Sequence, residues 1–293
     1  MRLHPSLVQS LGRQAARDPE DWEQTFRQMA LFDLAEDMKL GFLLAYYRNF
    51  AIPSGSDTLV TNGEIPARPL KRSFDTAIVI YELIANGLDS GRGRQMTALL
   101  NRVHRHVPGS DEDYLYVLMT LLVVPMRWTQ RHGWRKPTQT ERDAAIRFFT
   151  ELGSRMHISN IPATFDEAEV FFDDYESRRV GPSPAGRALM KATVEVFQSM
   201  QPRVLHPLTR LMIGTMLDDA RLTEALGLPR STWWSRVVLD AGLAVRNEIR
   251  RHTPLRAEPS FRSGQPLTPV YPHGYQLADV GPLNVMSARH RSN

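Results

Sequence analysis

Apolar residues recur along this chain at intervals of three and four positions, which is the spacing of one face of an α-helix. Val, Ile and Thr do not gather into the alternating runs that strands show. Helix-start signals recur instead: acidic residues follow Ser110, and the pairs Thr138/Glu141 and Thr164/Glu167 have the spacing of a capping box. The pattern predicts an all-α fold built as a single large multi-helix domain.

The predicted helix boundaries follow from local signals. Pro184 after Ser183 favours a first helical turn, and Ser231 is placed to cap the last long helix. Residues 51–69, rich in Gly, Pro and Ser, are predicted to form a long loop. Helices are expected at residues 5–17, 20–50, 71–88, 92–107, 111–132, 138–156, 164–178, 183–200, 206–226 and 231–251.

Residues 115–124 are apolar on nearly all sides, so this stretch is predicted to be a buried central helix. At about 10 residues it is too short to cross a bilayer, which takes about 20. Residues 1–22 show no apolar stretch of the signal-peptide kind. We therefore expect a cytoplasmic chain with no transmembrane segment, and peripheral membrane contact stays open. Thr120, inside the stretch, is expected to bond back to a helix carbonyl or to point at a ligand.

From Thr253 onward prolines recur and helical periodicity ends. The chain is therefore divided into a helical domain, residues 1–252, and an irregular, Pro-rich C-terminal tail, residues 253–293. A tail of this composition either wraps over the body or stays partly disordered. Two aromatic residues in it, Tyr271 and Tyr275, favour wrapping.

Composition narrows the possible chemistry. The 293 residues carry a formal charge of +4, which is small for this length and does not suggest nucleic-acid binding. The chain has no cysteine, which excludes disulfides, thiolate catalysis, iron–sulfur clusters and thiolate-ligated haem. Any metal must be held by His, by carboxylates or by a cofactor.

Two histidines lie two residues apart in the helix predicted at 92–107. His104 and His106 point to different helix faces, so they cannot both ligate one metal from an unbroken helix. A single axial histidine is enough for a macrocycle such as haem. The alternative is that His104 is an ordinary helix histidine with no ligand.

Cationic residues elsewhere offer partners for an anionic group. Arg72 and Thr76 are i,i+4 neighbours at the start of a predicted helix, and so are Lys71 and Asp75. Arg72 and Thr76 on one face suit a carboxylate such as a haem propionate, whereas the alternative is a surface salt bridge.

Two further arginines, Arg127 and Arg135, each lie beside a tryptophan. This arrangement suits recognition of a carboxylate or phosphate. It also suits a helix-end arginine that lies over an aromatic surface.

Around these residues the sequence resembles the MpaB-type oxygenase family, which also includes the rubber-degrading latex-clearing proteins. The resemblance spans most of residues 40–160, with scattered agreement beyond. The shared motifs, in order, are Phe50-Ala51-Ile52-Pro53-Ser54, Thr61-Asn62-Gly63-Glu64, Lys71-Arg72-x-x-Asp75-Thr76, Asn101-x-x-His104, Asp113-Tyr114-Leu115-Tyr116, Pro125-Met126-Arg127-Trp128, Trp134-Arg135, Glu141, Gly274-Tyr275 and Gly281-Pro282.

The resemblance implies an all-helical fold that encloses a b-type haem held by one axial histidine. His104 matches that ligand, and Arg72 and Thr76 match an Arg and a Thr near the haem. The best-known members cleave carbon–carbon double bonds of isoprenoid chains with dioxygen. No counterpart of the fungal relatives' N-terminal membrane anchor is expected. Leu118 stands where distant members often carry a second histidine, which places the chain nearer the fungal branch.

The expected function is that of a haem b-dependent oxygenase that uses dioxygen on an apolar, isoprenoid or alkenyl substrate. Arg72, with Arg127 or Arg135, is expected to anchor the propionates, and Asn101 to help position the site. The alternative is a non-catalytic binder of haem or of an apolar ligand, such as a carrier or sensor.

The residues that would act on the substrate side are less defined by the sequence. The candidates are Lys71, Asp75 and Thr120. Arg92 is expected to be exposed, so that it can serve as a control for substitutions of Arg72.

Overall fold

The computed structural model describes residues 5–15, 20–61, 68–105, 107–199 and 201–281. Helices dominate this part of the chain, and its β-structure is limited to one isolated bridge between Leu267 and Tyr271. The predicted all-α fold is confirmed. In chain order the elements are α1 (Pro5–Ala15), α2 (Trp22–Gln28), η1 (Met29–Asp33), α3 (Ala35–Asn49), α4 (Pro53–Thr61), α6 (Pro69–Asn86), α7 (Gly91–His104), α8 (Asp111–His132), α9 (Gln139–Arg155), α10 (Phe165–Arg179), α11 (Pro184–Ser199), η2 (Arg203–Leu205), α12 (His206–Leu217), α13 (Ala220–Ala225), α14 (Trp233–His252) and η3 (Leu277–Asp279).

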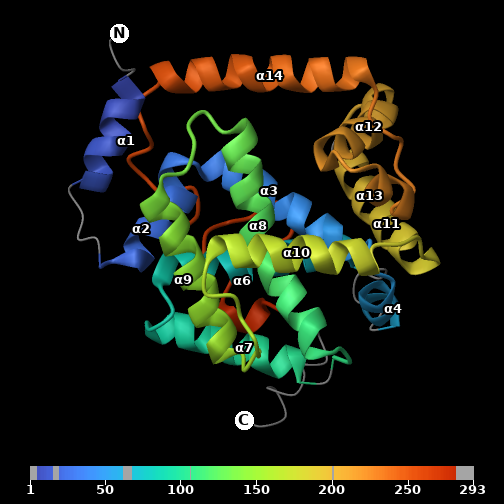
Figure 1. Ribbon diagram of the computed structural model, residues 1–293, viewed down its shortest axis with the longest axis horizontal. Coiled ribbons are helices and arrows are strands. Elements are labelled where there is room, and N and C mark those ends of the chain that lie inside the picture. Colours follow the sequence, from blue (N-terminus) through green and yellow to red (C-terminus); the bar gives the residue numbers. More distant parts are fainter. Residues whose placement is uncertain (1–4, 16–19, 62–67, 106, 200, 282–293) are drawn as a thin grey trace.

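Helix α8 passes through the middle of the molecule, where it packs against α3, α9 and α10 (Figure 1). Gly41 of α3 permits the close crossing, because a Cβ atom there would lie 2.3 Å from Cα of Pro125. Most of residues 115–124 are buried as predicted, but Val117 is 42% exposed. Helix α8 is therefore the central helix of the core, with one edge at the surface.

The polar residues at the predicted helix starts form the expected caps. Ser110, Thr138 and Thr164 each accept a hydrogen bond from the backbone N–H three residues later. The side chain of that later residue in turn accepts from the backbone of the cap, which completes the capping box. The last long helix is capped by Thr232 rather than by Ser231.

The prediction of one helix over residues 20–50 is wrong. The π-helical turn η1 and then Leu34, at φ −120°, separate α2 from α3. The Asp33 carboxylate is buried at this break, where it accepts hydrogen bonds from Ser10 and Gln28. A buried carboxylate needs such partners, and apolar periodicity gives no sign of them.

Two other boundary predictions are also wrong. The helix expected over residues 206–226 ends at Leu217, because Asp218 adopts a left-handed conformation (φ 48°) and Asp219 caps the separate helix α13. The loop expected over residues 51–69 contains α4, which Pro53 begins.

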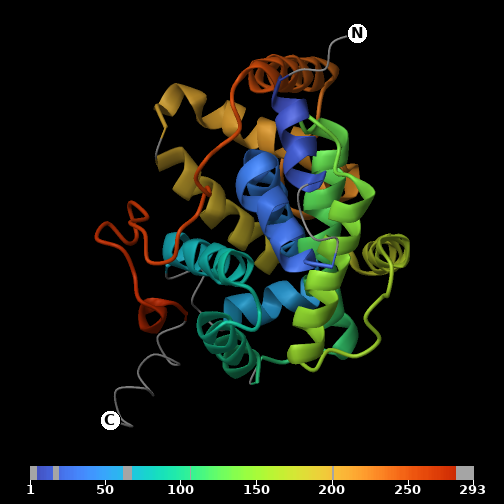
Figure 2. The ribbon, with the colours of Figure 1, turned by 90° about the vertical axis from the view of Figure 1, so that its left-hand side faces the viewer.

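The described part of the tail, residues 253–281, packs over α6 and α7 (Figure 2). Its buried side chains are Leu255, Phe261, Tyr271, Tyr275 and Val280. Phe261 stacks on Tyr81 of α6, with ring centroids 5.3 Å apart. These residues wrap over the body. The division of the chain at residue 252 stays a prediction, and residues 282–293 lie outside the described part.

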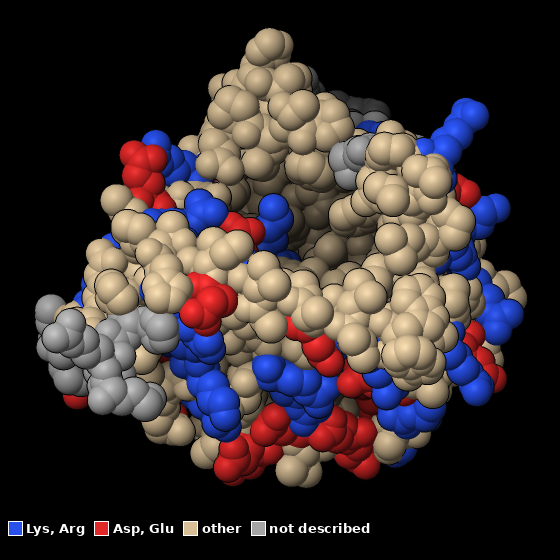
Figure 3. Space-filling model, turned by 90° about the horizontal axis from the view of Figure 1, so that it is seen from above, with Lys and Arg blue, Asp and Glu red and all other residues tan. Residues whose placement is uncertain are grey.

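Helix α14 lies along one edge of the molecule and contacts α1 and α12 at its two ends (Figure 1). It leaves several large apolar side chains exposed, including Trp233, Val238 and Ile249. Seen over α14, the middle of the surface is largely free of charged side chains and is hollowed (Figure 3). None of the described helices combines the length and the hydropathy that a membrane span requires. Peripheral membrane contact and a cytoplasmic location stay predictions.

Candidate functional site

Helices α6 and α7 pack against each other and carry three of the predicted site residues. Arg72 and Thr76 lie in the first turns of α6, which begins at Pro69, and His104 ends α7, which Ser90 caps. The charge of Arg72 reaches His104, since it is one cause of the lowered pKa of that imidazole. The fold therefore brings together the three residues that the sequence placed at one site.

The His104 imidazole is largely buried and neutral at pH 7. Burial, followed by the nearby charge of Arg72, lowers its pKa to about 4. Its Nδ1 atom is buried and forms no hydrogen bond of good geometry, although the Leu100 carbonyl lies near enough to favour the protonated ring. A neutral ring with a free lone pair is the form that ligates a metal.

Arg72 and Thr76 form a pair on one face of α6. The guanidinium donates to the Thr76 hydroxyl, which itself donates to the Arg72 carbonyl at 2.9 Å. Among the described residues, Arg72 forms no ion pair with a carboxylate. A partly buried arginine with no acidic partner is available for an anionic ligand.

Tyr46 of α3 lies beside this pair. Burial raises the pKa of its hydroxyl, and Ser73 and the charge of Arg72 oppose that rise. The Ser73 hydroxyl is 3.5 Å from the Tyr46 hydroxyl, at the limit of a hydrogen bond. The sequence analysis missed Tyr46, because its closeness to Arg72 comes from the packing of the helices and not from a spacing in the chain.

Asn101 lies one turn before His104 on α7, but its side chain turns to another element. Its Nδ2 atom donates to the carbonyl of Arg155 at 3.0 Å, at the end of α9. Asn101 therefore fixes the last turns of α7 against α9. Its predicted contribution to the site is in this sense indirect.

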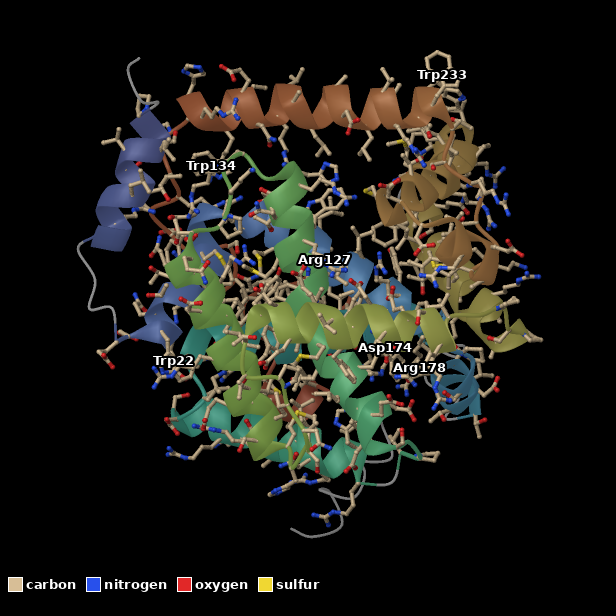
Figure 4. The ribbon with its side chains drawn as sticks, viewed as in Figure 1. Trp22, Arg127, Trp134, Asp174, Arg178 and Trp233 are labelled. Atoms are coloured by element: carbon tan, nitrogen blue, oxygen red, sulfur yellow. The ribbon has the colours of Figure 1, made fainter. Side chains whose placement is uncertain are left out.

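Arg127 does not lie with His104. It projects from α8 toward α10 (Figure 4), where Nε donates to Glu169 and the two terminal nitrogens donate to Asp173 at 2.6 and 2.8 Å. Its guanidinium also lies over the ring of Phe172, 5.4 Å from the centroid. These partners occupy the guanidinium, so we do not place Arg127 in the site.

Arg135 is likewise engaged elsewhere. Its side chain is 5% exposed, and it donates to both oxygens of Glu141 at 2.7 and 2.8 Å and to Asp33 at 3.3 Å. The neighbouring Trp134 donates from Nε1 to the Asp33 carbonyl at 2.8 Å. Arg135 thus holds the start of α9 to the break between α2 and α3, and we do not place it in the site.

The substrate-side candidates are also bonded within the protein. The Thr120 hydroxyl donates back to the Tyr116 carbonyl at 2.7 Å, which is the ordinary arrangement for a buried helix threonine. Lys71 and Asp75 form an ion pair at 2.6 Å that the tail covers. Asp75 therefore faces the tail, next to the face that carries Arg72 and Thr76.

The expectation that Arg92 is exposed is wrong. Its guanidinium donates two hydrogen bonds, at 2.6 and 2.7 Å, to the fully buried carboxylate of Glu82. Burial opposes ionisation of Glu82, but the bonds from Arg92, Tyr275 and Ser263 outweigh it and lower the pKa of that carboxyl. Arg92 cannot serve as a neutral control, and the exposed Arg94 of the same helix replaces it.

A sequence model of the family described as ER-bound oxygenase mpaB/B′/rubber oxygenase, catalytic domain, matches residues 34–247. The chain belongs to this family. Its match therefore spans α3 to most of α14 and includes Arg72, Thr76 and His104.

Individual relatives of this mpaB-type chain are distant. It is 28% identical over 226 residues to ER-bound oxygenase mpaB′ of Penicillium brevicompactum, which covers 71% of this chain and 53% of the relative. It is 28% identical over 200 residues to ER-bound oxygenase mpaB of Penicillium roqueforti (strain FM164), covering 62% and 67%. The chain thus spans about half the length of mpaB′.

A solved structure of a latex clearing protein in the closed state has a similar fold. The TM-score is 0.58 at 16% identity, over 85% of this chain and 74% of that one. At this identity the likeness concerns the fold alone. It agrees with the all-α architecture of the mpaB-type chain.

A second aromatic residue at the site, Tyr114 of α8, lies in one of the motifs shared with the mpaB-type family. Its ring meets that of His104 edge-on, with centroids 5.8 Å apart at 82°. Its hydroxyl donates to the Val107 carbonyl at 2.5 Å and lies 3.3 Å from the His104 carbonyl. Tyr114 therefore holds the end of α7 against α8. The predicted comparison residue, His106, lies outside the described residues.

Proposed function

We propose that this chain is a haem b-dependent oxygenase that uses dioxygen to oxidise an apolar, alkenyl substrate of the isoprenoid kind. Membership of an oxygenase family supports the reaction class. The single observation that supports the cofactor is His104: a half-buried imidazole kept neutral, beside Arg72, which pairs with no carboxylate among the described residues.

The residues present fit the requirements of haem. A histidine that ligates haem iron must be neutral, and its other nitrogen ordinarily faces a backbone carbonyl, a carboxylate or water. His104 meets the first requirement through burial and the second through the nearby Leu100 carbonyl. The described residues contain no cluster of three or more His, Cys, Asp or Glu side chains that could hold a metal ion.

In this proposal His104 ligates through Nε2, and Arg72 with Thr76 binds a propionate. Haem supplies the redox-active iron for dioxygen chemistry when it is bound. Nδ1 of His104 is buried and has no hydrogen-bond partner of good geometry within the described residues. The charge of Arg72 balances a carboxylate and also discourages protonation of His104, which preserves its lone pair.

The protein would also exclude water from the reacting groups. In this proposal the apolar and largely buried stretch of α8 over residues 115–124 would supply a dry wall. A dry wall suits an apolar substrate and limits side reactions of reduced oxygen with water.

A visible spectrum of the protein titrated with haemin tests the proposal. The wild-type protein should develop a Soret band and should couple oxygen uptake to loss of an isoprenoid alkene. His104→Ala should fold but show a displaced or missing band and no oxygen uptake, because the sole iron ligand is lost.

The matched control is His106→Ala, which should keep both the band and the oxygen uptake. The opposite pattern would assign the iron to His106, and unaltered spectra in both variants would mean that neither histidine holds it. A normal band without oxygen uptake in the wild-type protein would favour a non-catalytic haem carrier or sensor.

A further inference from the structure

We propose that the C-terminal segment acts as a positioning latch: Tyr271 and Gly281, through Asp75, hold the first turns of α6 and so orient Arg72 toward its ligand. The ligand in question is the one of the proposed function, on which this inference rests. The latch comprises Tyr271, Gly281 and the ion pair Lys71–Asp75.

Asp75 is 3% exposed, and its two oxygens are fully occupied. The Tyr271 hydroxyl is 2.5 Å from Oδ1, while Lys71 Nζ and the Gly281 backbone N–H donate to Oδ2 at 2.6 and 3.1 Å. Two of these three donors come from the tail, 196 and 206 residues further along the chain. A buried carboxylate needs such donors to be stable. The latch therefore fixes the position of the first turns of α6, which carry Asp75.

Lys71 strengthens the same connection from the α6 side. Its ammonium donates to the carbonyls of Asp279 and Gly281 at 3.0 and 3.3 Å. It also lies 5.6 Å from the ring centroid of Tyr271. The latch therefore consists of reciprocal bonds between the tail and α6, with charge of both signs on the helix side.

The latch lies beside the proposed site on both of the helices that form it. Asp75 precedes Thr76 and lies within one turn of Arg72, on the adjoining face of α6. On α7, a Cβ atom at Gly281 would be 3.8 Å from Leu99, which is also buried and lies five residues before His104. A shift of the latch is therefore transmitted directly to the residues proposed to bind the cofactor.

A second attachment of the tail provides a matched comparison. Two turns further along the same face of α6, the Tyr275 hydroxyl donates to the buried Glu82, which Ser263 and Asn86 also contact. This attachment has the same chemistry, a tyrosine on a buried carboxylate, but it lies away from Arg72. Comparing the two attachments separates the effect of the latch on the position of Arg72 from the general effect of losing a buried hydrogen bond.

The experiment compares Tyr271→Phe with Tyr275→Phe. Each should lower the melting temperature of the protein by about 2–4 °C, because each removes one buried hydrogen bond. Tyr271→Phe should in addition speed haem dissociation about 10-fold and shift the Soret band, whereas Tyr275→Phe should leave both at the wild-type value. Equal haem dissociation in the two variants would overturn the latch.

Hydrogen exchange of the haem-free protein gives a readout that does not depend on the cofactor. Tyr271→Phe should speed exchange of the amides over residues 72–79 at least about 10-fold, and Tyr275→Phe should act mainly over residues 80–86. Unchanged exchange over residues 72–79 in Tyr271→Phe would overturn the latch. A wild-type protein that develops no Soret band would instead overturn the proposed function, while the exchange pattern would still decide the latch.

Discussion

Two arginines of this protein, Arg135 and Arg72, differ in the hydrogen-bond and ion-pair partners of their guanidinium groups. Arg135 is buried and bonded to both Glu141 and Asp33. Arg72 is also partly buried, yet among the described residues its side chain bonds Thr76 and no carboxylate, and its charge lowers the pKa of His104. Buried charges that stabilise a structure are ordinarily paired, so the difference marks Arg135 as structural and is the reason for proposing Arg72 as a ligand-binding residue.

The same contrast divides the two faces of α6. The face with Asp75 and Glu82 is saturated by donors from the tail and from α7. The face with Arg72 and Thr76 has no acidic partner in the described part of the chain. In the proposed function, one helix would carry a face that holds the fold together and, beside it, a face that binds the ligand.

The largest effect is expected where a structural arginine is removed. Arg135→Ala should lower the free energy of unfolding by about 3–5 kcal/mol, because the buried carboxylates of Glu141 and Asp33 would each lose a buried cationic partner. Urea unfolding at pH 7 measures it. Arg127→Ala is the control: its side chain is 37% exposed, so the loss should be about 1 kcal/mol or less. Similar losses in the two variants would erase the distinction between the buried and the surface network.

The next effect concerns pH. The unfolded imidazole takes up a proton near pH 6.5, but burial and Arg72 delay that uptake in folded His104 to about pH 4. Between these values the unfolded state binds more protons, so the stability of the haem-free protein should fall as the pH is lowered from 6.5 to 4.

The contribution of His104 to that fall should approach about 3 kcal/mol. The difference in urea stability between wild type and His104→Leu, followed across this range, isolates it from the carboxylates. A difference that stays constant between pH 6.5 and 4 would contradict a buried, neutral His104.

Substitution of Arg72 should affect ligand binding more than stability, which is the opposite of what is expected for Arg135. Arg72→Ala should change the stability of the haem-free protein by less than about 1 kcal/mol. It should weaken haem retention by about 2 kcal/mol, because a hydrogen bond to a charged group is lost. Haem transfer to an acceptor protein measures retention, with Arg94→Ala as the exposed control from α7. Equal retention in the two variants would remove Arg72 from the site.

The smallest effect is expected at Thr120. Since its hydroxyl only bonds back to the Tyr116 carbonyl, Thr120→Val should cost about 1 kcal/mol or less. The haem spectrum should stay unchanged. A displaced Soret band in this variant would restore Thr120 as a residue that faces the ligand.

Local signals in the sequence predicted the helices well where they act within one turn. The caps at Ser110, Thr138 and Thr164 are all present, because a cap needs only residues three positions apart. The break at Asp33 and the left-handed Asp218 were missed. The first depends on partners from α1 and from Arg135, which lie far away in the chain.

For the site, the sequence supplied the residues but not their partners. The shared motifs indicated Arg72, Thr76 and His104, and α6 and α7 bring them together. The same motifs gave no way to see that Arg135 is bound by Glu141, or that Tyr46 lies beside Arg72. Tertiary packing decides which arginine is free, and one sequence carries no direct record of it. The role of these residues in haem binding stays a prediction.

The attachment of the tail to α6 also sets the order in which the molecule can be completed during its synthesis. Asp75 leaves the ribosome 196 residues before Tyr271 does. At about 5–20 residues per second, this interval is roughly 10–40 s. During this interval, water occupies the places of Tyr271 at Asp75 and of Tyr275 at Glu82. The tail therefore cannot yet cover these carboxylates. Attachment of the tail to α6 is thus one of the last steps of biogenesis. A chain halted near residue 252 would keep the pairs Lys71–Asp75 and Arg92–Glu82 but would lack the two tyrosine donors that cover them in the finished protein.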